Sequence, residues 1–326
     1  MPSPRVLAFD AGGTKLLGGV VDADGVVHNR VRLPIAGAGR EELLDIFAES
    51  SQELRRMAPD VVAAGFGIPS LIDRGRGLSV QSVHLPLDDL PFGEVMEKRL
   101  GVPVAWDNDT NLALLAEHRL GAARGASEAL MLTIGTGIGG AIMLDGELYR
   151  GSAGAAGELG HVTVDLEGPP CQGGCPGRGC LEAVASGTAI GREAALAAAE
   201  APESGLGRAV ASGRPPIGEL VTELAHAGDA AAQSVLELVG RRLGAGVVNL
   251  VHIFNPEVVV LGGGAMAAGD YLLGPARAVV AERGLRPSRD VVRVVAASLG
   301  DDAGLVGAAL AALEVAVGEE TAGAWR

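Results

Sequence analysis

The sequence predicts an α/β protein, because apolar segments with strand-like and helix-like spacing follow one another along the chain. Its 326 residues suggest two domains, or one large domain. Two segments, 7–25 and 132–147, also share one plan: apolar strand, turn of small residues, apolar strand, Asp-Gly turn. A fold made from two related halves that face a cleft would produce this echo, although two similar hairpins could also arise by chance.

The elements follow from these patterns in chain order. A β-meander opens the chain, with strands at 6–10, 16–22 and 26–33 separated by glycine turns. Later strands are expected where apolar residues run without a break, at 61–67, 102–106, 129–134, 141–144, 257–261 and 291–296. Helices are expected where apolar residues recur at helical spacing, at 40–57, 92–100, 110–120, across most of 181–252, after 264 and at 303–317.

Composition narrows the class of protein. Hydrophobic residues make up 48% and charged residues 20%, so a sizeable core is expected, filled mostly by Ala and Val because aromatics are only 3%. A net charge of -14 argues against a nucleic-acid surface and against binding to an anionic membrane. No apolar stretch approaches the ~20 residues of a membrane span, and no signal-peptide core is evident. We therefore expect a soluble cytoplasmic protein.

The segment Asp10-Ala11-Gly12-Gly13-Thr14-Lys15 places a carboxylate at a strand end before residues without bulk. Backbone N–H groups in such a turn can approach phosphate oxygens, and the carboxylate can hold Mg²⁺ through water. An ordinary hairpin turn would have the same composition. The segment alone leaves both interpretations open.

Two further glycine loops are candidate phosphate or nucleotide contacts. Residues 135–140 match G-x-G-x-x-G, but a strand follows instead of a helix, so a dinucleotide fold is excluded. Gly262, Gly263 and Gly264 lie between a strand and a helix, where a backbone can approach a nucleotide or simply pack closely.

Asp107-Asn108-Asp109 lies where a strand meets a helix. Capping the helix needs only one of these side chains. A second carboxylate can therefore face a cleft and accept a proton from an attacking hydroxyl. The pattern does not decide between Asp107 and Asp109.

His161, Cys171, Cys175 and Cys180 have the spacing H-x9-C-x3-C-x4-C, which uses every cysteine of the protein. Three thiolates and an imidazole form a closed tetrahedral set for structural Zn²⁺. Glu158 and Glu182 flank this knuckle; they are either solvated surface residues or ligands of a polyhydroxylated molecule.

Together these segments resemble the ROK family of sugar kinases, within the superfamily of sugar kinases and actin. The resemblance extends from the first strand to the last helix. It rests on DAGGTK (10–15), DNDTN (107–111), GTGIGG (135–140), AGAAGELGH (153–161), GCLE (179–182) and LGGG (261–264).

The resemblance implies a two-domain actin-like ATPase fold, related to ribonuclease H, with a cleft between the domains. Residues 1–107 and 303–326 would form the smaller domain, and 108–302 the larger domain with the zinc knuckle. It also implies a homodimer.

The resemblance implies an ATP-dependent hexose 6-kinase, most simply a glucokinase, that uses Mg²⁺ and structural Zn²⁺. Asp109 would be the catalytic base, and Asn108, Glu158, His161 and Glu182 would contact the sugar. ATP and its phosphates would be bound by Asp10, Gly12, Gly13, Thr14, Lys15, Gly135, Thr136, Gly137, Gly262, Gly263 and Gly264. Zinc would be bound by His161, Cys171, Cys175 and Cys180.

Two departures from the family pattern bear on this interpretation. The family knuckle usually reads C-x-C, whereas two extra residues separate Cys171 from Cys175, which makes Cys171 the ligand least supported by the pattern. His84-Leu85-Pro86-Leu87 stands where many members have Asn-Leu-Pro-Gly-Trp, which weakens the inference of glucose by analogy.

Other interpretations remain open at this point. The substrate could be mannose, fructose, N-acetylmannosamine or N-acetylglucosamine, and the donor could be polyphosphate. A sugar-responsive transcriptional regulator is disfavoured, because only five residues precede the first strand and the charge is negative. A non-catalytic sugar-binding protein is disfavoured by Asp109 next to Asn108.

Overall fold

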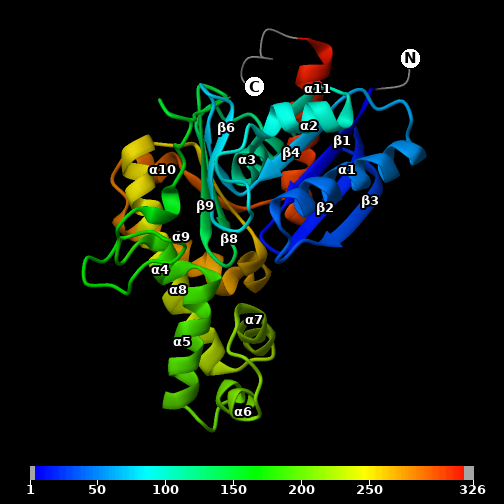
Figure 1. The fold of residues 1–326 in the computed structure, drawn as a ribbon. Helices are drawn as coiled ribbons and strands as arrows, with labels where there is room; N and C mark the ends of the chain where they lie inside the picture. The colour runs from blue at the N-terminus through cyan, green and yellow to red at the C-terminus, as the bar shows by residue number, and fades with distance from the viewer. Residues whose placement is uncertain (1–3, 319–326) are drawn as a thin grey trace. The chain divides into compact units, whose positions relative to one another are not determined.

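Residues 4–318 are described in the computed structural model, and they form two units, each built on a five-stranded sheet (Figure 1). Unit 1 holds the described residues up to Gly125, Leu148–Ala156 and those from Leu299. Unit 2 holds Ala126–Glu147 and Gly157–Ser298. The ends of the smaller expected domain, 1–3 and 319–326, lie outside the described residues.

The sheet of unit 1 has the order β3-β2-β1-β4-β7. Its strands are β1 (Arg5–Ala11), β2 (Lys15–Asp22), β3 (Val27–Pro34), β4 (Ala64–Ile68) and β7 (Val104–Asn108). The first three form the expected antiparallel meander, and β1, β4 and β7 run parallel. Asp10 pairs with Gly67, and Gly67 pairs with Asp107, so two acidic residues share one row at the carboxyl edge.

Aromatic side chains form much of one core of unit 1, beside α1 (Arg40–Met57) and α2 (Phe92–Leu100). Neighbouring ring centroids of this cluster lie 4.9 to 6.4 Å apart. The cluster comprises Phe9, Phe47, Phe66, Phe92 and Trp106. Five of the nine aromatic residues of the chain thus lie in this cluster, whereas the other core of unit 1 relies on small residues.

That second core lies beside α3 (Asp109–Leu120) and α11 (Ala303–Val317). The two helices approach closely because α11 has small residues. A Cβ on Gly307 would overlap the carbonyl oxygen of Leu112 in α3, and a Cβ on Gly65 would overlap that of Ala308 in α11. Gly307 therefore lets α11 pack directly against α3, which begins at Asp109, and Gly65 lets α11 pack directly against β4.

A short antiparallel hairpin, β5 (Ser70–Asp73) and β6 (Leu78–Ser82), was not expected from the sequence. Only a few of its residues are apolar, so it carries little hydrophobic signal. Its turn carries Arg74, which is important for the site.

Unit 2 repeats the plan of unit 1. Its sheet has the order β10-β9-β8-β11-β12, with β8 antiparallel to β9 and parallel to β11, and β11 parallel to β12. The strands are β8 (Ala129–Ile134), β9 (Ile138–Leu144), β10 (Glu147–Leu148), β11 (Val258–Gly262) and β12 (Arg293–Ala296). The internal echo in the sequence therefore corresponds to two equivalent hairpins, β1–β2 and β8–β9.

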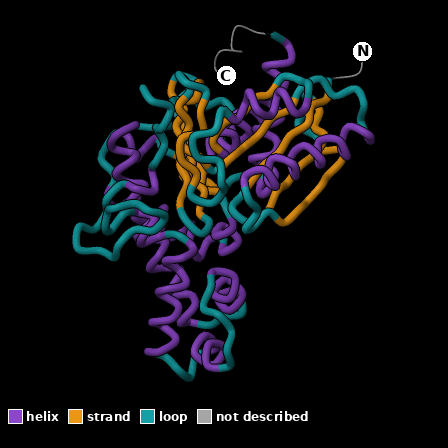
Figure 2. Tube along the Cα trace, viewed as in Figure 1, coloured by secondary structure: helices purple, strands orange, loops and turns teal. Residues whose placement is uncertain are grey.

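Helices carry most of unit 2 between 181 and 254 (Figure 2). They are α4 (Leu181–Ala185), α5 (Gly187–Glu200), α6 (Gly205–Ala211), α7 (Gly218–His226) and α8 (Ala230–Phe254). A 3₁₀ turn, Gly264–Ala268, follows the glycine triplet and precedes α9 (Asp270–Arg283); α10 (Ser288–Val291) is one turn long. Asn255, at φ 48°, ends α8 in the left-handed conformation before Pro256.

Among residues 4–318, none of the helices has both the length and the apolar character that crossing a bilayer would require.

Candidate active site

The carboxyl edge of the unit 1 sheet gathers three aspartates. Asp10 lies near the end of β1, Asp107 lies in β7, and Asp109 is the first residue of α3. The row Asp10–Gly67–Asp107 is fixed by strand register, and Asp109 follows two residues later. A Cβ on Gly67 would lie 3.5 Å from both Asp10 Oδ1 and Asp109 Cα, so only a glycine separates these two residues.

Asp107 is buried and fully occupied by protein donors. Its Oδ2 lies 2.6 Å from an Arg74 guanidinium nitrogen and 2.8 Å from one of Arg150. Its Oδ1 accepts from the backbone N–H of Asn108 at 2.8 Å and from the Asn111 amide at 3.1 Å. Burial raises the pKa of Asp107, but the charges of Arg74 and Arg150 outweigh burial and lower it. Asp107 is therefore a fixed anion and a poor proton acceptor.

Asn108 caps α3. Its Oδ1 accepts from the backbone N–H groups of Thr110 at 2.9 Å and Asn111 at 3.3 Å. One of the three side chains of the motif was expected to cap the helix, and the structure shows that it is Asn108. The cap therefore fixes the backbone at the start of α3, where Asp109 is the first residue.

Asp109 is half-buried and keeps one oxygen free. Its Oδ1 accepts from the Thr110 backbone N–H at 2.7 Å, while Oδ2 bonds to no donor of the described residues. Burial raises the pKa of Asp109, although the Thr110 hydrogen bonds act in the opposite direction. A raised pKa and a free oxygen are the properties of a general base, so the geometry favours Asp109 over Asp107.

The carboxyl group of Asp10 packs closely against Gly304, a residue that the sequence analysis did not identify. A Cβ on Gly304, at the start of α11, would lie 2.7 Å from the Asp10 carboxyl carbon. Burial and the neighbouring charge of Asp109 raise the pKa of Asp10 to about 7, while Lys15 lowers it. Two carboxylates that resist ionising together favour a cation beside them, and carboxylate oxygen is the ligand type that Mg²⁺ prefers.

The turn at Gly12–Thr14 joins β1 to β2, so it is a hairpin turn as well as a candidate phosphate loop. The N–H of Gly12 donates to the carbonyl of Lys15 at 2.9 Å. His84 packs over the turn, since a Cβ on Gly13 would lie 2.9 Å from His84 Cβ. The charge of His84 also lowers the pKa of Asp109, by less than the hydrogen bonds from Thr110 do.

The loop Gly135–Gly137 occupies the equivalent position in unit 2, between β8 and β9. The strand that follows agrees with the exclusion of a dinucleotide fold. Gly263, at φ 85°, packs against this hairpin, because a Cβ there would lie 2.5 Å from the Ile134 carbonyl oxygen. Gly264 has open space around its Cα and leaves room for a ligand.

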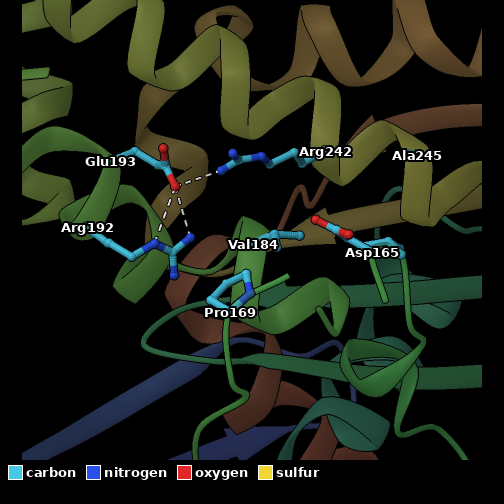
Figure 3. A pocket seen from close by; sticks show the side chains of 8 residues that line it. Asp165, Pro169, Val184, Arg192, Glu193, Arg242 and Ala245 are labelled. Carbon is cyan, nitrogen blue, oxygen red and sulfur yellow. Dashed lines mark hydrogen bonds and ion pairs between the residues drawn. The ribbon is translucent and has the colours of Figure 1, made fainter. Parts of the chain in front are cut away.

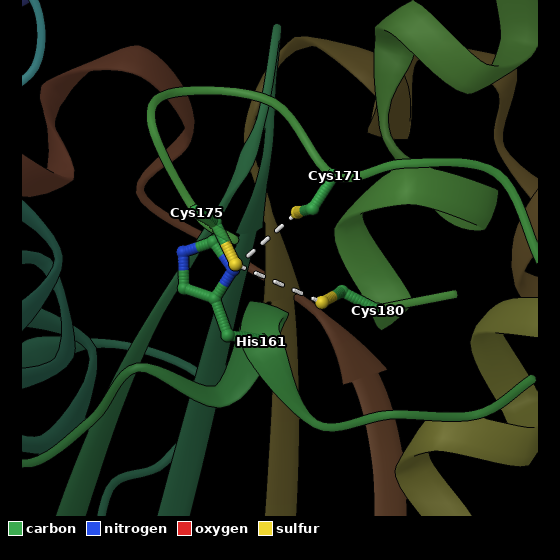
Figure 4. A group of neighbouring side chains, drawn as sticks. All are labelled: His161, Cys171, Cys175 and Cys180. Atoms are coloured by element: carbon green, nitrogen blue, oxygen red, sulfur yellow. Dashed lines mark hydrogen bonds between the residues drawn. The ribbon is translucent and has the colours of Figure 1, made fainter. Parts of the chain in front are cut away.

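His161, Cys171, Cys175 and Cys180 converge in unit 2 (Figure 4). Their ligand atoms all lie within 4.8 Å of one another. Cys171 Sγ is 3.5 Å from His161 Nδ1, and Cys175 Sγ is 4.0 Å from Cys180 Sγ. A Zn²⁺ with ~2.3 Å bonds to sulfur has tetrahedral edges of about 3.8 Å, and both of these distances lie near that value, so the cluster is compact enough to hold a tetrahedral metal. Cys171 belongs to this set despite its altered spacing.

The thiols need a cation to ionise. Burial and the neighbouring thiols raise the pKa of Cys171, and burial also raises that of Cys180. His161 directs Nδ1 to the cluster and Nε2 towards Glu158, whose Oε2 is 3.7 Å away. This division of the two ring nitrogens is typical of a metal-bound histidine.

Glu182 is buried, unlike the half-exposed Glu158. Its Oε2 accepts from the backbone N–H of Ile138 at 2.8 Å, and its Oε1 lies 3.6 Å from Cys171 Sγ. The structure thus places Glu182 between the knuckle and the 135–137 loop.

A separate hollow of about 230 Å³ lies in unit 2, and none of the residues that line it was predicted to belong to the active site (Figure 3). Glu193 Oε1 accepts from Arg192 at 2.9 Å and pairs with Arg242 at 2.8 Å beside it. Its remaining lining comes from Val164, Asp165, Pro169, Val184 and Ala245.

Comparison with known proteins supports what the site suggests. The model of the ROK family matches residues 6–315. The chain belongs to the ROK family.

Relatives within the family are similar over nearly the whole chain. The glucokinase of Thermotoga maritima is 36% identical over 313 residues, covering 95% of this chain and 97% of that protein. The glucokinase of Streptomyces coelicolor is 34% identical over 308 residues, covering 93% and 96%.

Solved ROK structures share the fold. A ROK glucokinase from Streptomyces griseus, in complex with glucose and AMPPNP, has a TM-score of 0.83 and 32% identity, covering 95% of this chain and 99% of that one. A ROK hexokinase from Thermus thermophilus has a TM-score of 0.75 and 37% identity, with the same coverage. The two-domain actin-like α/β fold expected from the sequence is confirmed.

Sequence reasoning missed several residues that shape this ROK site: Arg74, Arg150, Gln172 and Gly304. The arginines lie 33 and 43 positions from Asp107 in the chain and in unremarkable loops. Gly304 could have been noticed, because it stands in a run of small residues at the start of the last helix.

Asp107→Asn tests the ion-paired network. The substitution leaves two guanidinium groups without their buried counter-charge, which costs ~3–5 kcal/mol in comparable buried pairs. We expect the melting temperature to fall by roughly 5 °C or more. Glu223→Gln, which breaks a solvent-exposed pair with Arg214, is the control and should leave the melting temperature unchanged. Equal melting temperatures for the two variants would contradict the role given to Asp107.

Proposed function

We propose that this protein is an ATP-dependent glucokinase that transfers the γ-phosphoryl group of ATP to the 6-hydroxyl of glucose. The observation that carries the proposal is Asp109: a carboxylate with a raised pKa and a free oxygen, held at the start of α3 by the Asn108 cap. The sequence similarity to glucokinases over nearly the whole chain supports the same reaction.

In the proposed step, Asp109 Oδ2 accepts the proton of the sugar 6-hydroxyl. The oxygen then forms a bond to the γ-phosphorus as the bond between that phosphorus and the bridging oxygen breaks, and ADP leaves with the electron pair. Asp107 keeps its proton-free state throughout because Arg74 and Arg150 neutralise it. The base and the fixed anion are therefore different residues, two positions apart.

The turns around Gly12, Gly13 and Thr14 and around Gly135, Thr136 and Gly137 are proposed to donate backbone N–H groups to the phosphates, with Lys15 adding a positive charge. Gly264, with Gly262 and Gly263 behind it, is proposed to lie by the adenosine. Asp10 would hold Mg²⁺, which neutralises charge on the phosphates when bound.

Asn108, Glu158, His161 and Glu182 are proposed to contact the sugar hydroxyls. The side chains of Glu158 and His161 are partly exposed, and Glu182 would use the lone pairs that Ile138 leaves free. His161, Cys171, Cys175 and Cys180 would bind a structural Zn²⁺, which stabilises the glycine-rich knuckle and fixes the orientation of the His161 ring.

A cytoplasmic homodimer is the proposed setting, since the reaction draws on ATP and the family resemblance implies dimers.

The function is tested by coupled ADP release with ATP and Mg²⁺ across a panel of hexoses and N-acetylhexosamines. We expect the highest kcat/KM with glucose. Higher kcat/KM with mannose, fructose or an N-acetylhexosamine would correct the substrate and retain the kinase. Absence of turnover with every sugar, with polyphosphate also tried as donor, would contradict the proposal.

Asp109→Asn tests the base. The amide keeps the size and the bond to Thr110 but cannot accept the hydroxyl proton, so kcat should fall by ~10²–10⁴ while glucose binding persists. Glucose affinity is measured by calorimetry and kcat by ADP release. Near-normal turnover in the variant would remove Asp109 as the base.

The pH profile reports the state of the same group. Only the ionised carboxylate can accept the proton, and the pKa of Asp109 is raised above its ordinary 3.8. We therefore expect kcat/KM to fall on the acid side at a pH clearly above 3.8, while the melting temperature over that range shows the protein still folded. Full activity down to pH 4 would rule out a raised pKa.

A further inference from the structure

The knuckle contains a short loop, Gln172-Gly173-Gly174, between its first two cysteines. Gly173 and Gly174 have φ values of 66° and 80°, in the left-handed region that favours glycine. These two residues turn the chain sharply within the three positions between Cys171 and Cys175. Gln172 is thereby brought to the β8–β9 loop of the same unit.

Gln172 bonds to the backbone of that loop. Its Nε2 donates to the Thr136 carbonyl oxygen at 2.8 Å, and Thr188 Oγ1 donates to the same oxygen at 2.8 Å. The backbone N–H of Gly187 donates to the Gly135 carbonyl at 2.8 Å. A carbonyl oxygen has two lone pairs, so the Thr136 carbonyl is held by a full set of donors.

The direction of a carbonyl decides the direction of the next N–H, because the peptide group is planar and trans. Holding the Thr136 carbonyl on the knuckle side turns the Gly137 N–H to the opposite side. Holding the Gly135 carbonyl does the same for the Thr136 N–H. Neither N–H donates to an acceptor of residues 4–318, so both are available to an anion.

A second connection reaches the other end of the loop. Cys171 Sγ lies 3.6 Å from Glu182 Oε1, and Glu182 Oε2 accepts from the Ile138 N–H at 2.8 Å. Glu182, which lies beside Cys171, thus holds the residue that follows the loop, while Gln172 holds the loop at Thr136.

We propose that Gln172 is a positioning residue that couples the metal knuckle to the nucleotide: with the knuckle closed around its metal, Gln172 holds the Thr136 carbonyl so that the loop N–H groups face the ATP phosphates. The proposal rests on the proposed kinase function for its ligand. It predicts that Gln172 and the metal act together on nucleotide affinity, and that substituting Gln172 alone leaves glucose affinity unchanged.

The test measures binding of a non-hydrolysable ATP analogue with Mg²⁺ by calorimetry, together with KM for ATP, KM for glucose and zinc content. Gln172→Ala removes the donor, and Gln172→Glu keeps the length but places a carboxylate against the carbonyl. We expect the Kd of the analogue and the KM for ATP to rise about twofold to tenfold, which is the effect of one hydrogen bond. KM for glucose and zinc content should not change.

Gln233→Ala is the matched control. Gln233 also donates to a backbone carbonyl, that of Ala225, at 3.0 Å, but within the helices of unit 2. Its loss should leave the analogue affinity unchanged. Thr188→Val is an independent variant that removes the other donor to the Thr136 carbonyl. Like Gln172→Ala, it should raise the Kd of the analogue.

Chelation of the metal completes the cycle. Chelation should weaken binding of the analogue to the wild-type protein. It should affect binding to Gln172→Ala much less, because the coupling is already lost in that variant. Unchanged analogue affinity in both Gln172 variants would overturn the proposal, and so would loss of zinc from them. Failure of the wild-type protein to bind the analogue would instead contradict the proposed kinase function.

Discussion

The ion pairs of Asp107 with Arg74 and Arg150 are the interaction on which the active-site edge depends. They join β7 to the β5–β6 turn and to the segment after β10, at distances of 2.6 and 2.8 Å. A buried carboxylate without such partners would be costly, so the arginines make it possible to keep an anion beside the proposed base, Asp109. With Asp107 neutralised and Asn108 used as a cap, Asp109 is left as the residue with a free oxygen and a raised pKa.

The two units share one supersecondary arrangement, but different chemical groups lie beside its glycine turn in each unit. Each places a glycine turn between the first two strands of its sheet, at 12–14 and at 135–137. In unit 1 the neighbouring carboxylates Asp10 and Asp109 supply negative charge suited to a cation and to proton transfer. In unit 2, Gln172 of the neighbouring knuckle and Thr188 of α5 donate the hydrogen bonds that fix the loop backbone.

Much of this could be predicted from the sequence, because strands, hairpin echoes and the Cys/His cluster are local patterns. The strand–turn–strand plan gave β1–β2 and β8–β9, and the spacing of His161, Cys171, Cys175 and Cys180 gave a cluster that the structure brings together. The choice between Asp107 and Asp109 could not be made from spacing, because it depends on Arg74 and Arg150, which approach from distant loops without any local signal. The hydrogen bond from Gln172 to the Thr136 carbonyl could not be predicted either, because it depends on the path of the loop between Cys171 and Cys175.

Two neighbouring aspartates of one motif have opposite pKa shifts, and carbon-13 NMR titration of the aspartate side-chain carboxyls tests this directly. Asp107→Asn and Asp109→Asn assign the two resonances. We expect the Asp109 carboxyl to titrate above 3.8 and the Asp107 carboxyl to titrate below 3.8. An Asp107 carboxyl that gains its proton at higher pH than Asp109 would contradict the assignment of the base and of the fixed anion.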